Sequence, residues 1–164
     1  MDKSLSDLDI KAQGINNIIL YEDLYRVSPQ QLLSMLPVAI LYQPHTKDPN
    51  MGHWTLLHKV PGSVEFFDSY GFKPDQEFEV MERQQPHYIA KMLLRLMPLT
   101  TMSYSPYRFQ AKDNHIATCG RWIAVRNRFS DYGIDKFAKA IDYCSKARGI
   151  TGDEVVVRLT EPGY

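Results

Sequence analysis

Two strand-like runs, "GHWTLLH" and "SVEFFDSYG", flank a Pro-Gly pair at positions 61 and 62. Proline presets φ for a turn and glycine accepts a positive φ, so the pair is a strong turn signal. The segment therefore predicts a β-hairpin, which fixes the pairing of two strands before anything else is known about the chain. With the turn centred on Pro61-Gly62, residues pair when their numbers add to 123, so His53 lies opposite Tyr70 and Thr55 lies opposite Asp68.

This register places a histidine and a carboxylate on one face of the hairpin. His53 and Asp68 become diagonal neighbours, about 7–8 Å apart at the backbone, which lets an imidazole N–H reach a carboxylate oxygen. The prediction depends on the register, because a slip of one residue would send Asp68 to the opposite face. His58 is an odd step from His53 and points the other way, so the two histidines do not form a shared metal site. Taken separately, His53 is explained equally well as a histidine at the end of a loop, and Asp68 as an acid at the end of a strand.

Several other elements have local signals. Ser28, Pro29 and the leucines of "SPQQLLSMLP" predict a helix that Pro37 ends, and "VAILYQ" predicts a buried strand. We also expect a short helix ended by Gly14, a strand in "NNIILYEDL", a helix in "PHYIAKMLLRLMP", and a strand and then a loop in "TTMSYSPYRFQAKDNHIAT". A helix over about 134–147 ends before Gly149 and carries Phe137, Ile141 and Cys144 on one face. The tail "GDEVVVRLTEPGY" fits either a strand or a short helix capped by Asp153.

Composition narrows the class of protein. The 164 residues include 19 basic and 19 acidic side chains, which fits one globular domain over 1–164 and makes nucleic acid an unexpected main partner. The sequence contains neither a bilayer-spanning apolar run nor a signal-peptide core, so we expect a soluble, intracellular protein without a membrane partner. Two cysteines make no disulfide framework, which suits a reducing compartment.

The stretch "HIATCGRWIAVRNRF" places Cys119 at the start of an amphipathic helix. Trp122, Ile123, Val125 and Phe129 form the apolar side, while Arg121, Arg126 and Arg128 fill much of the wet side. Thr118 is the expected N-cap. A cysteine in the first turn meets backbone N–H groups and the positive end of the helix dipole, which favour a thiolate. A small apolar residue at a helix start explains Cys119 equally well from this stretch alone.

A cysteine nucleophile requires a base and an acceptor that orients it, and the hairpin supplies both in His53 and Asp68. His115 is a second candidate base, although nothing orients it as clearly. Trp54, beside the base, is either a wall of a substrate channel or plain core. An oxyanion would be stabilised by the backbone N–H of Cys119 or Gly120 and by a side-chain amide, for which Gln110 is the best placed and Asn114 is the nearer rival. Gly120 also lets a substrate backbone approach.

The order His53, Asp68, Gln110, Cys119, carried by "GHWTLL", "FFDSYG", "FQ" and "TCGRW", resembles the cysteine proteases of the adenovirus protease (adenain) and SUMO-specific protease superfamily. It is most similar to the small versions encoded by large DNA viruses. The resemblance covers roughly residues 52–126. It departs from the family in the interval between Gln110 and Cys119, which is longer than usual.

The resemblance implies an α+β fold with a central, mostly antiparallel sheet packed against the nucleophile helix and flanked by further helices. It also implies that His53 is the general base, that Asp68 orients it, that Cys119 attacks the scissile carbonyl, and that Gln110 supplies an oxyanion donor. Trp54 would line a narrow tunnel that admits small residues, often glycine. No cofactor is expected.

These implications predict that the chain is a cysteine endopeptidase. We expect it to be viral and to mature capsid or core precursor proteins in the host cytoplasm or the virion. One alternative is release of ubiquitin or a ubiquitin-like modifier from conjugates by the same chemistry. A second, from another class, is an inactive peptide-binding module. Acetyl transfer is disfavoured because the sequence shows no basic cofactor pocket. The expected partner is in each case a protein or peptide.

Overall fold

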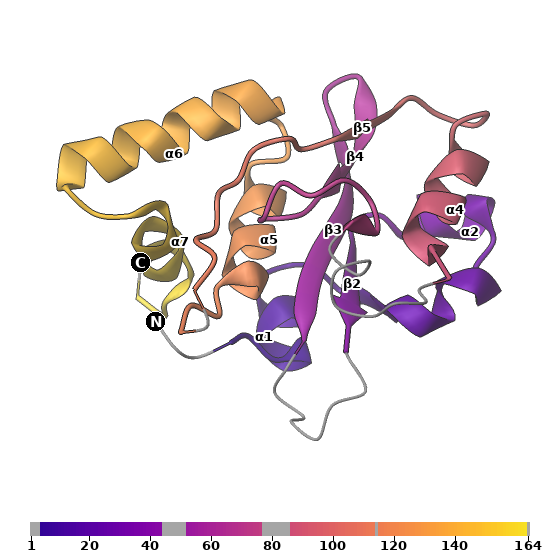
Figure 1. Cartoon of the computed structure of the whole chain (residues 1–164), viewed down its shortest axis with the longest axis horizontal. Helices are drawn as coiled ribbons and strands as arrows, with labels where there is room; N and C mark the ends of the chain where they lie inside the picture. Colours follow the sequence, from indigo (N-terminus) through magenta and orange to yellow (C-terminus); the bar gives the residue numbers. More distant parts are fainter. Residues whose placement is uncertain (1–3, 44–51, 77–85, 114, 164) are drawn as a thin grey trace.

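The computed structural model describes residues 4–43, 52–76, 86–113 and 115–163. Figure 1 shows these parts arranged as a central sheet with helices on both sides. In chain order the elements are α1 (Asp7–Ala12), β1 (Asn17–Leu20), the 3-10 helix η1 (Tyr21–Arg26), α2 (Pro29–Met35), β2 (Val38–Tyr42), β3 (His53–Val60), β4 (Ser63–Phe67), α4 (Tyr88–Leu96), β5 (Met102–Tyr104), α5 (Cys119–Arg128), α6 (Ile134–Arg148) and α7 (Gly152–Thr160).

The sheet has the strand order β1-β2-β3-β4-β5. The central strand β3 runs antiparallel to both of its neighbours, β2 and β4, as expected. The two outer pairs, β1 with β2 and β4 with β5, are parallel, so the sheet is mixed rather than mostly antiparallel. Both parallel pairs are joined through connections that contain helices, η1 and α2 for the first and α4 for the second, as parallel strands require.

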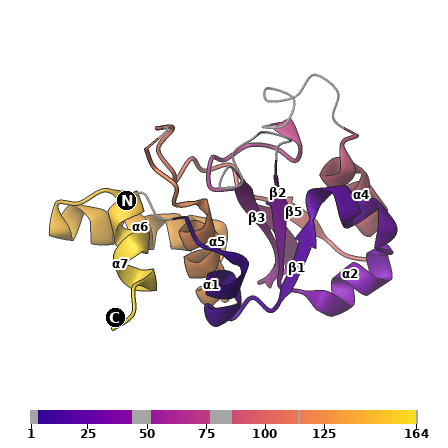
Figure 2. The ribbon, with the colours of Figure 1, turned by 90° about the horizontal axis from the view of Figure 1, so that it is seen from below.

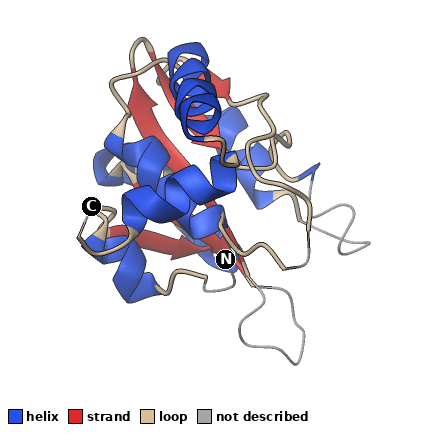
Figure 3. Cartoon of the chain, turned by 90° about the vertical axis from the view of Figure 1, so that its left-hand side faces the viewer, coloured by secondary structure: helices blue, strands red, loops and turns tan. Residues whose placement is uncertain are grey.

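Apolar side chains fill both faces of this sheet. On one face, Trp54 and Leu56 of β3 pack in a cluster with Trp122 and Ile123 of α5. On the other face, Leu57 belongs to a second cluster that includes residues of η1, α2 and α4. Figure 2 shows the same two layers of helix from below, and Figure 3 shows the helices of the first layer in front of the strands. The structure is therefore a three-layer α+β arrangement, in which β3 contacts both cores.

The local signals in the sequence explain most helix boundaries. Ser28 caps α2 through a hydrogen bond to the backbone of Gln31, whose side chain bonds back to Ser28, and Pro29 takes the first helical position. Gly149 ends α6 in the left-handed conformation. The tail forms a helix, α7, and its cap is Thr151, which pairs with Glu154; Asp153 is therefore not the cap.

Two expectations about side-chain exposure are wrong. Cys144 does not share the buried face of α6 with Phe137, because it is exposed to solvent. Arg126 does not lie on a wet side of α5, because it is fully buried beside Glu65. A charged residue inside the core requires a partner that the periodicity of its own helix cannot reveal.

Candidate active site

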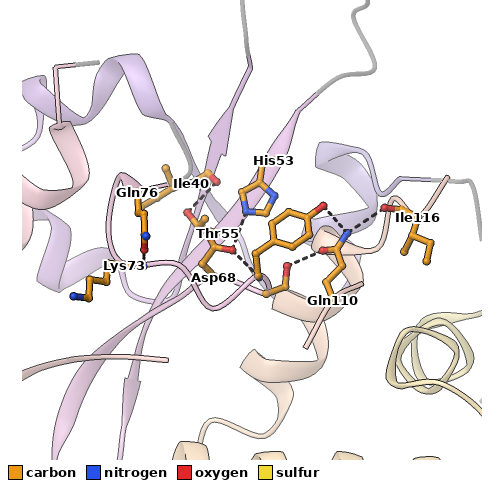
Figure 4. Close-up of polar contacts among 10 residues, drawn as sticks. Ile40, His53, Thr55, Asp68, Lys73, Gln76, Gln110 and Ile116 are labelled. Carbon is orange, nitrogen blue, oxygen red and sulfur yellow. Dashed lines mark hydrogen bonds and ion pairs between the residues drawn. The ribbon is translucent and has the colours of Figure 1, made fainter. Parts of the chain in front are cut away.

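The hairpin of β3 and β4 brings His53 and Asp68 into contact. Its register runs from Leu56↔Phe67 to Val60↔Ser63, and the numbers of each pair add to 123, as the turn predicts. His53 is the first residue of β3 and Asp68 directly follows β4. The His53 Nε2 atom lies 3.1 Å from Asp68 Oδ1, and both residues are buried (Figure 4). The two side chains therefore form a shielded imidazole–carboxylate pair.

The turn after β4 holds the carboxylate in place. Asp68 Oδ1 accepts a second hydrogen bond, 2.9 Å long, from the backbone N–H of Tyr70. The N–H of Gly71 donates to the Asp68 carbonyl at 2.9 Å and closes the turn. Gly71 has a φ of +71°, and a Cβ there would lie 2.6 Å from the Tyr107 carbonyl oxygen. Only glycine fits this position.

Tyr70 orients the imidazole from a second side. Its ring stacks on His53 with centroids 5.1 Å apart and an interplanar angle of 19°. The predicted register places these two residues opposite each other, but the sequence analysis gave Tyr70 no part in the site. The rule that paired residue numbers add to 123, which placed Asp68 on the same face as His53, could also have identified Tyr70.

Gln110 lies in a network that connects this pair with the loop before Cys119. Its Nε2 donates to the Tyr70 hydroxyl at 3.3 Å and to the carbonyl of Ile116 at 3.1 Å. Its Oε1 accepts from the Ser69 hydroxyl at 2.7 Å, and its backbone N–H donates to the Ser69 carbonyl at 2.9 Å. Figure 4 shows this row of contacts running from His53 to Ile116. Gln110 is thus fixed in position, and Ser69 is a further residue that the sequence analysis missed.

Cys119 is the first residue of α5 and is 6 % exposed. Thr118 occupies the N-cap position, as predicted, but its side chain does not cap the helix. The hydroxyl instead donates to Asp153 Oδ1 at 2.5 Å. The first turn of α5 consequently presents backbone N–H groups that the N-cap side chain does not occupy, beside the thiol of Cys119.

The residues next to the thiol and the imidazole touch each other. A Cβ built on Gly120 would lie 3.2 Å from Trp54 Cδ1 and 3.0 Å from Leu5 Cβ, so a larger residue would have to displace these two side chains. Trp54 is buried, and its Nε1 donates to the Leu5 carbonyl at 3.1 Å. Gly120 therefore allows close packing of α5 on β3, and Leu5 covers the indole. A substrate-binding role for Trp54 and Gly120 stays a prediction.

The imidazole lies at the end of the sheet. Trp54 and Leu56 belong to the cluster on the α5 side, whereas His53 alternates with Trp54 and starts from the opposite face. β3 begins at His53 and β4 ends just before Asp68, so the pair lies at the end of both strands. From there the Tyr70–Gln110–Ile116 contacts lead to the loop before Cys119.

A second buried histidine–carboxylate pair lies farther along the same hairpin. His58 Nε2 is 3.0 Å from Glu65 Oε1, and Arg126 Nε donates to the same oxygen at 2.9 Å. Burial lowers the pKa of His58, despite the raising effect of Glu65. Burial also raises the pKa of Glu65, but the hydrogen bonds from His58 and Arg126 outweigh it and leave that pKa lowered. This trio is a neutral histidine beside an ion pair and is held inside the core.

The sequence offered two further candidates, His115 as a base and Asn114 as an oxyanion donor. His115 is an exposed loop residue. Asn114 lies outside the described residues. Within the described ranges, the structure contains no group of three histidine, cysteine, aspartate or glutamate side chains that could hold a metal ion. No helix in those ranges is both long and apolar enough to span a bilayer.

The fold and the site define an α+β protein with a buried imidazole–carboxylate pair, a fixed glutamine and a cysteine at a helix start. No protein-family profile matches the chain. The "Uncharacterized protein V9" of Sputnik virophage is 32% identical over 163 residues, which cover 95% of this chain and 90% of that protein. The chain belongs to the same family as this virophage protein.

Proposed function

We propose that the chain is a cysteine endopeptidase of the adenovirus protease and SUMO-specific protease superfamily. Cys119 is the nucleophile, His53 is the general base and Asp68 orients the base. The observation that carries the proposal is the buried contact of His53 Nε2 with Asp68 Oδ1 at 3.1 Å, which is tied through Tyr70 and Gln110 to the loop before Cys119. This polar row differs from the buried His58–Glu65–Arg126 trio because it leads to the residues before a cysteine at a helix start.

The proton transfers follow from which imidazole nitrogen Asp68 holds. With Nε2–H donated to the carboxylate, Nδ1 takes the proton of the Cys119 thiol as the sulfur attacks the carbonyl carbon of the substrate. The C–N bond then breaks, the proton on Nδ1 passes to the leaving amine, and a thioester remains on Cys119. Water attacks the thioester while His53 takes one of its protons. The C–S bond then breaks, the carboxylic acid leaves, and the proton on Nδ1 returns to the sulfur and restores the thiol. Asp68 stabilises the imidazolium in both halves of the cycle.

Two sets of donors are proposed for the oxyanion. The backbone N–H groups at the start of α5 form one set, because Thr118 does not cap them. The Gln110 carboxamide forms the other. Its longer hydrogen bond, 3.3 Å to the Tyr70 hydroxyl, is the weaker of its two donor contacts and is the one that a substrate oxygen would replace. Preorganised donors of this kind are each worth ~10²–10³-fold in rate.

The proposed substrates are precursor proteins of a virus particle, cut after small residues such as glycine in the host cytoplasm or the virion. A relative encoded by a virophage supports a viral role for the family. The resemblance to the superfamily supports the preference for small residues. Release of a ubiquitin-like modifier is the alternative with the same chemistry.

The test is identification of newly formed protein ends in a cell lysate treated with the chain, with the Cys119→Ala variant as control. We expect new ends that follow glycine or another small residue with the active chain and none with the variant. Covalent capture of a ubiquitin-tail probe would move the substrate to modifier conjugates. Binding of peptides without any cleavage by the unaltered chain would refute the peptidase and identify a binding module.

A further inference from the structure

Asp153 is a buried carboxylate that accepts hydrogen bonds from three donors, two at the start of α5 and one in the loop before it. It lies in the first turn of α7 and is 3 % exposed. Its Oδ1 accepts from the Thr118 hydroxyl at 2.5 Å and from Trp122 Nε1 at 2.9 Å. Its Oδ2 accepts from the backbone N–H of Ala111 at 3.0 Å. Its position in the sequence suggests only a helix cap, a role that Thr151 takes instead.

The partners of Asp153 are the chain neighbours of two proposed catalytic groups. Thr118 directly precedes Cys119, and Ala111 directly follows Gln110. One carboxylate therefore connects the backbone that carries the sulfur with the backbone that carries the carboxamide, and Trp122 anchors it one turn farther along α5. We propose that Asp153 is a positioning residue that sets the distance between Cys119 and the oxyanion donor Gln110. This inference rests on the proposed function.

The chemistry of the three partners requires a carboxylate. All of them donate, and an ionised carboxylate has two oxygens that only accept. Asparagine would keep one oxygen but would turn its NH₂ group toward a donor, so either the Ala111 contact or the pair of contacts to α5 would be lost. The three donors are all uncharged, and the described residues supply no ion-pair partner for Asp153. The three hydrogen bonds and the place of Asp153 in the first turn of α7 stabilise a carboxylate there.

Misplacement of Gln110 should weaken the binding of ligands that form an oxyanion at Cys119 and should not affect thiol reagents that form none. A peptide aldehyde ending in glycinal forms a bond between its carbonyl carbon and the Cys119 sulfur, while the thiol proton moves through His53 to the carbonyl oxygen. That oxygen then lies where the oxyanion donors point, so the affinity depends on the position of Gln110. Iodoacetamide also alkylates the sulfur, but iodide leaves and no oxyanion forms. The ratio of the two responses therefore separates misplaced donors from a general loss of structure.

The experiment compares both reagents in a Cys144→Ser background, so that Cys119 is the single thiol. For Asp153→Asn we expect the aldehyde affinity to fall by ~10²-fold, the loss typical of one oxyanion donor, while the alkylation rate changes by less than about threefold. Thr118→Val, which removes one of the bonds with little change in shape, should weaken aldehyde binding in the same direction, and Thr118→Ser should restore it. Glu154→Gln is the matched control: it weakens the cap of α7 without touching Asp153.

Three outcomes would overturn the inference. Unchanged aldehyde affinity in both Asp153→Asn and Thr118→Val would show that the carboxylate positions nothing. Equal losses of affinity and alkylation rate, matched by Glu154→Gln, would show a purely structural role. If the chain with native Asp153 neither bound the aldehyde nor cleaved any protein, the proposed function itself would fail, and the inference would fail with it.

Discussion

The hairpin contains two buried histidine–carboxylate pairs. We expect the charge of Asp68 to affect mainly the catalytic rate and the charge of Glu65 to affect mainly the stability of the fold. Asp68→Asn removes the charge from the His53 pair, and Glu65→Gln removes it from the His58 pair. Asparagine at position 68 can still accept from His53 Nε2 and from the Tyr70 N–H through one oxygen. Replacing charge-assisted hydrogen bonds by neutral ones lowers the free energy of unfolding by roughly 1–2 kcal/mol. The same change should lower kcat ~10²–10⁴-fold, which corresponds to about 3 to 5 kcal/mol of transition-state stabilisation.

Glu65→Gln should give the reverse pattern. Arg126 is fully buried and donates to both carboxylate oxygens of Glu65, at 2.9 and 3.3 Å, so loss of that charge leaves an uncompensated guanidinium in the core. The expected loss of stability is about 3–5 kcal/mol. The catalytic rate per folded molecule should change little, because no atom of this trio belongs to the proposed site.

The assay combines urea unfolding with hydrolysis of a fluorogenic peptide that has glycine before the scissile amide. Activity is normalised to the folded fraction of each variant. If both variants lost rate in proportion to stability, or if Asp68→Asn kept full kcat, the distinction between a catalytic and a structural pair would be wrong.

Three further predictions follow from burial and conformation. Iodoacetamide should label the nearly buried Cys119 faster than the exposed Cys144 at neutral pH. If mass spectrometry found the reverse order, accessibility alone would control the alkylation rates of the two thiols. Burial lowers the pKa of His58 below its unfolded value of 6.5, so below about pH 6.5 the unfolded chain binds more protons than the folded chain. The free energy of unfolding should therefore fall on acidification, by at most about 1.4 kcal/mol per pH unit. Urea titrations of His58→Gln should lack this component. Gly71→Ala should lower the melting temperature and the activity together, because its Cβ would strike the Tyr107 carbonyl; a melting temperature equal to that of the unaltered chain would contradict the tight turn.

Sequence patterns predicted the parts of this fold that short-range chemistry controls. The hairpin register follows from one turn, and the pairing of Leu56 with Phe67 confirms it. The cap at Ser28, the left-handed stop at Gly149 and the helix that starts at Cys119 are likewise set by neighbouring residues. The contact of His53 with Asp68 could be predicted because both residues belong to that one hairpin.

Contacts between distant segments were beyond the same reasoning. The parallel pairing of β4 with β5 depends on a crossover whose direction no turn encodes. The burial of Arg126 depends on Glu65, which lies on another element. Asp153 accepts from a loop and from α5, so its role could not be inferred from the pattern of its own helix.

The packing of α7 and of the segment before α1 around α5 has a consequence for biosynthesis. Leu5 contacts Trp54 and the position of Gly120, and Asp153 holds the residues beside Gln110 and Cys119. A ribosome must therefore release the chain through α7 before these groups can assemble. If the chain is a peptidase, a nascent chain that still lacks α7 would be inert toward neighbouring proteins, and activity would begin only after α7 has emerged.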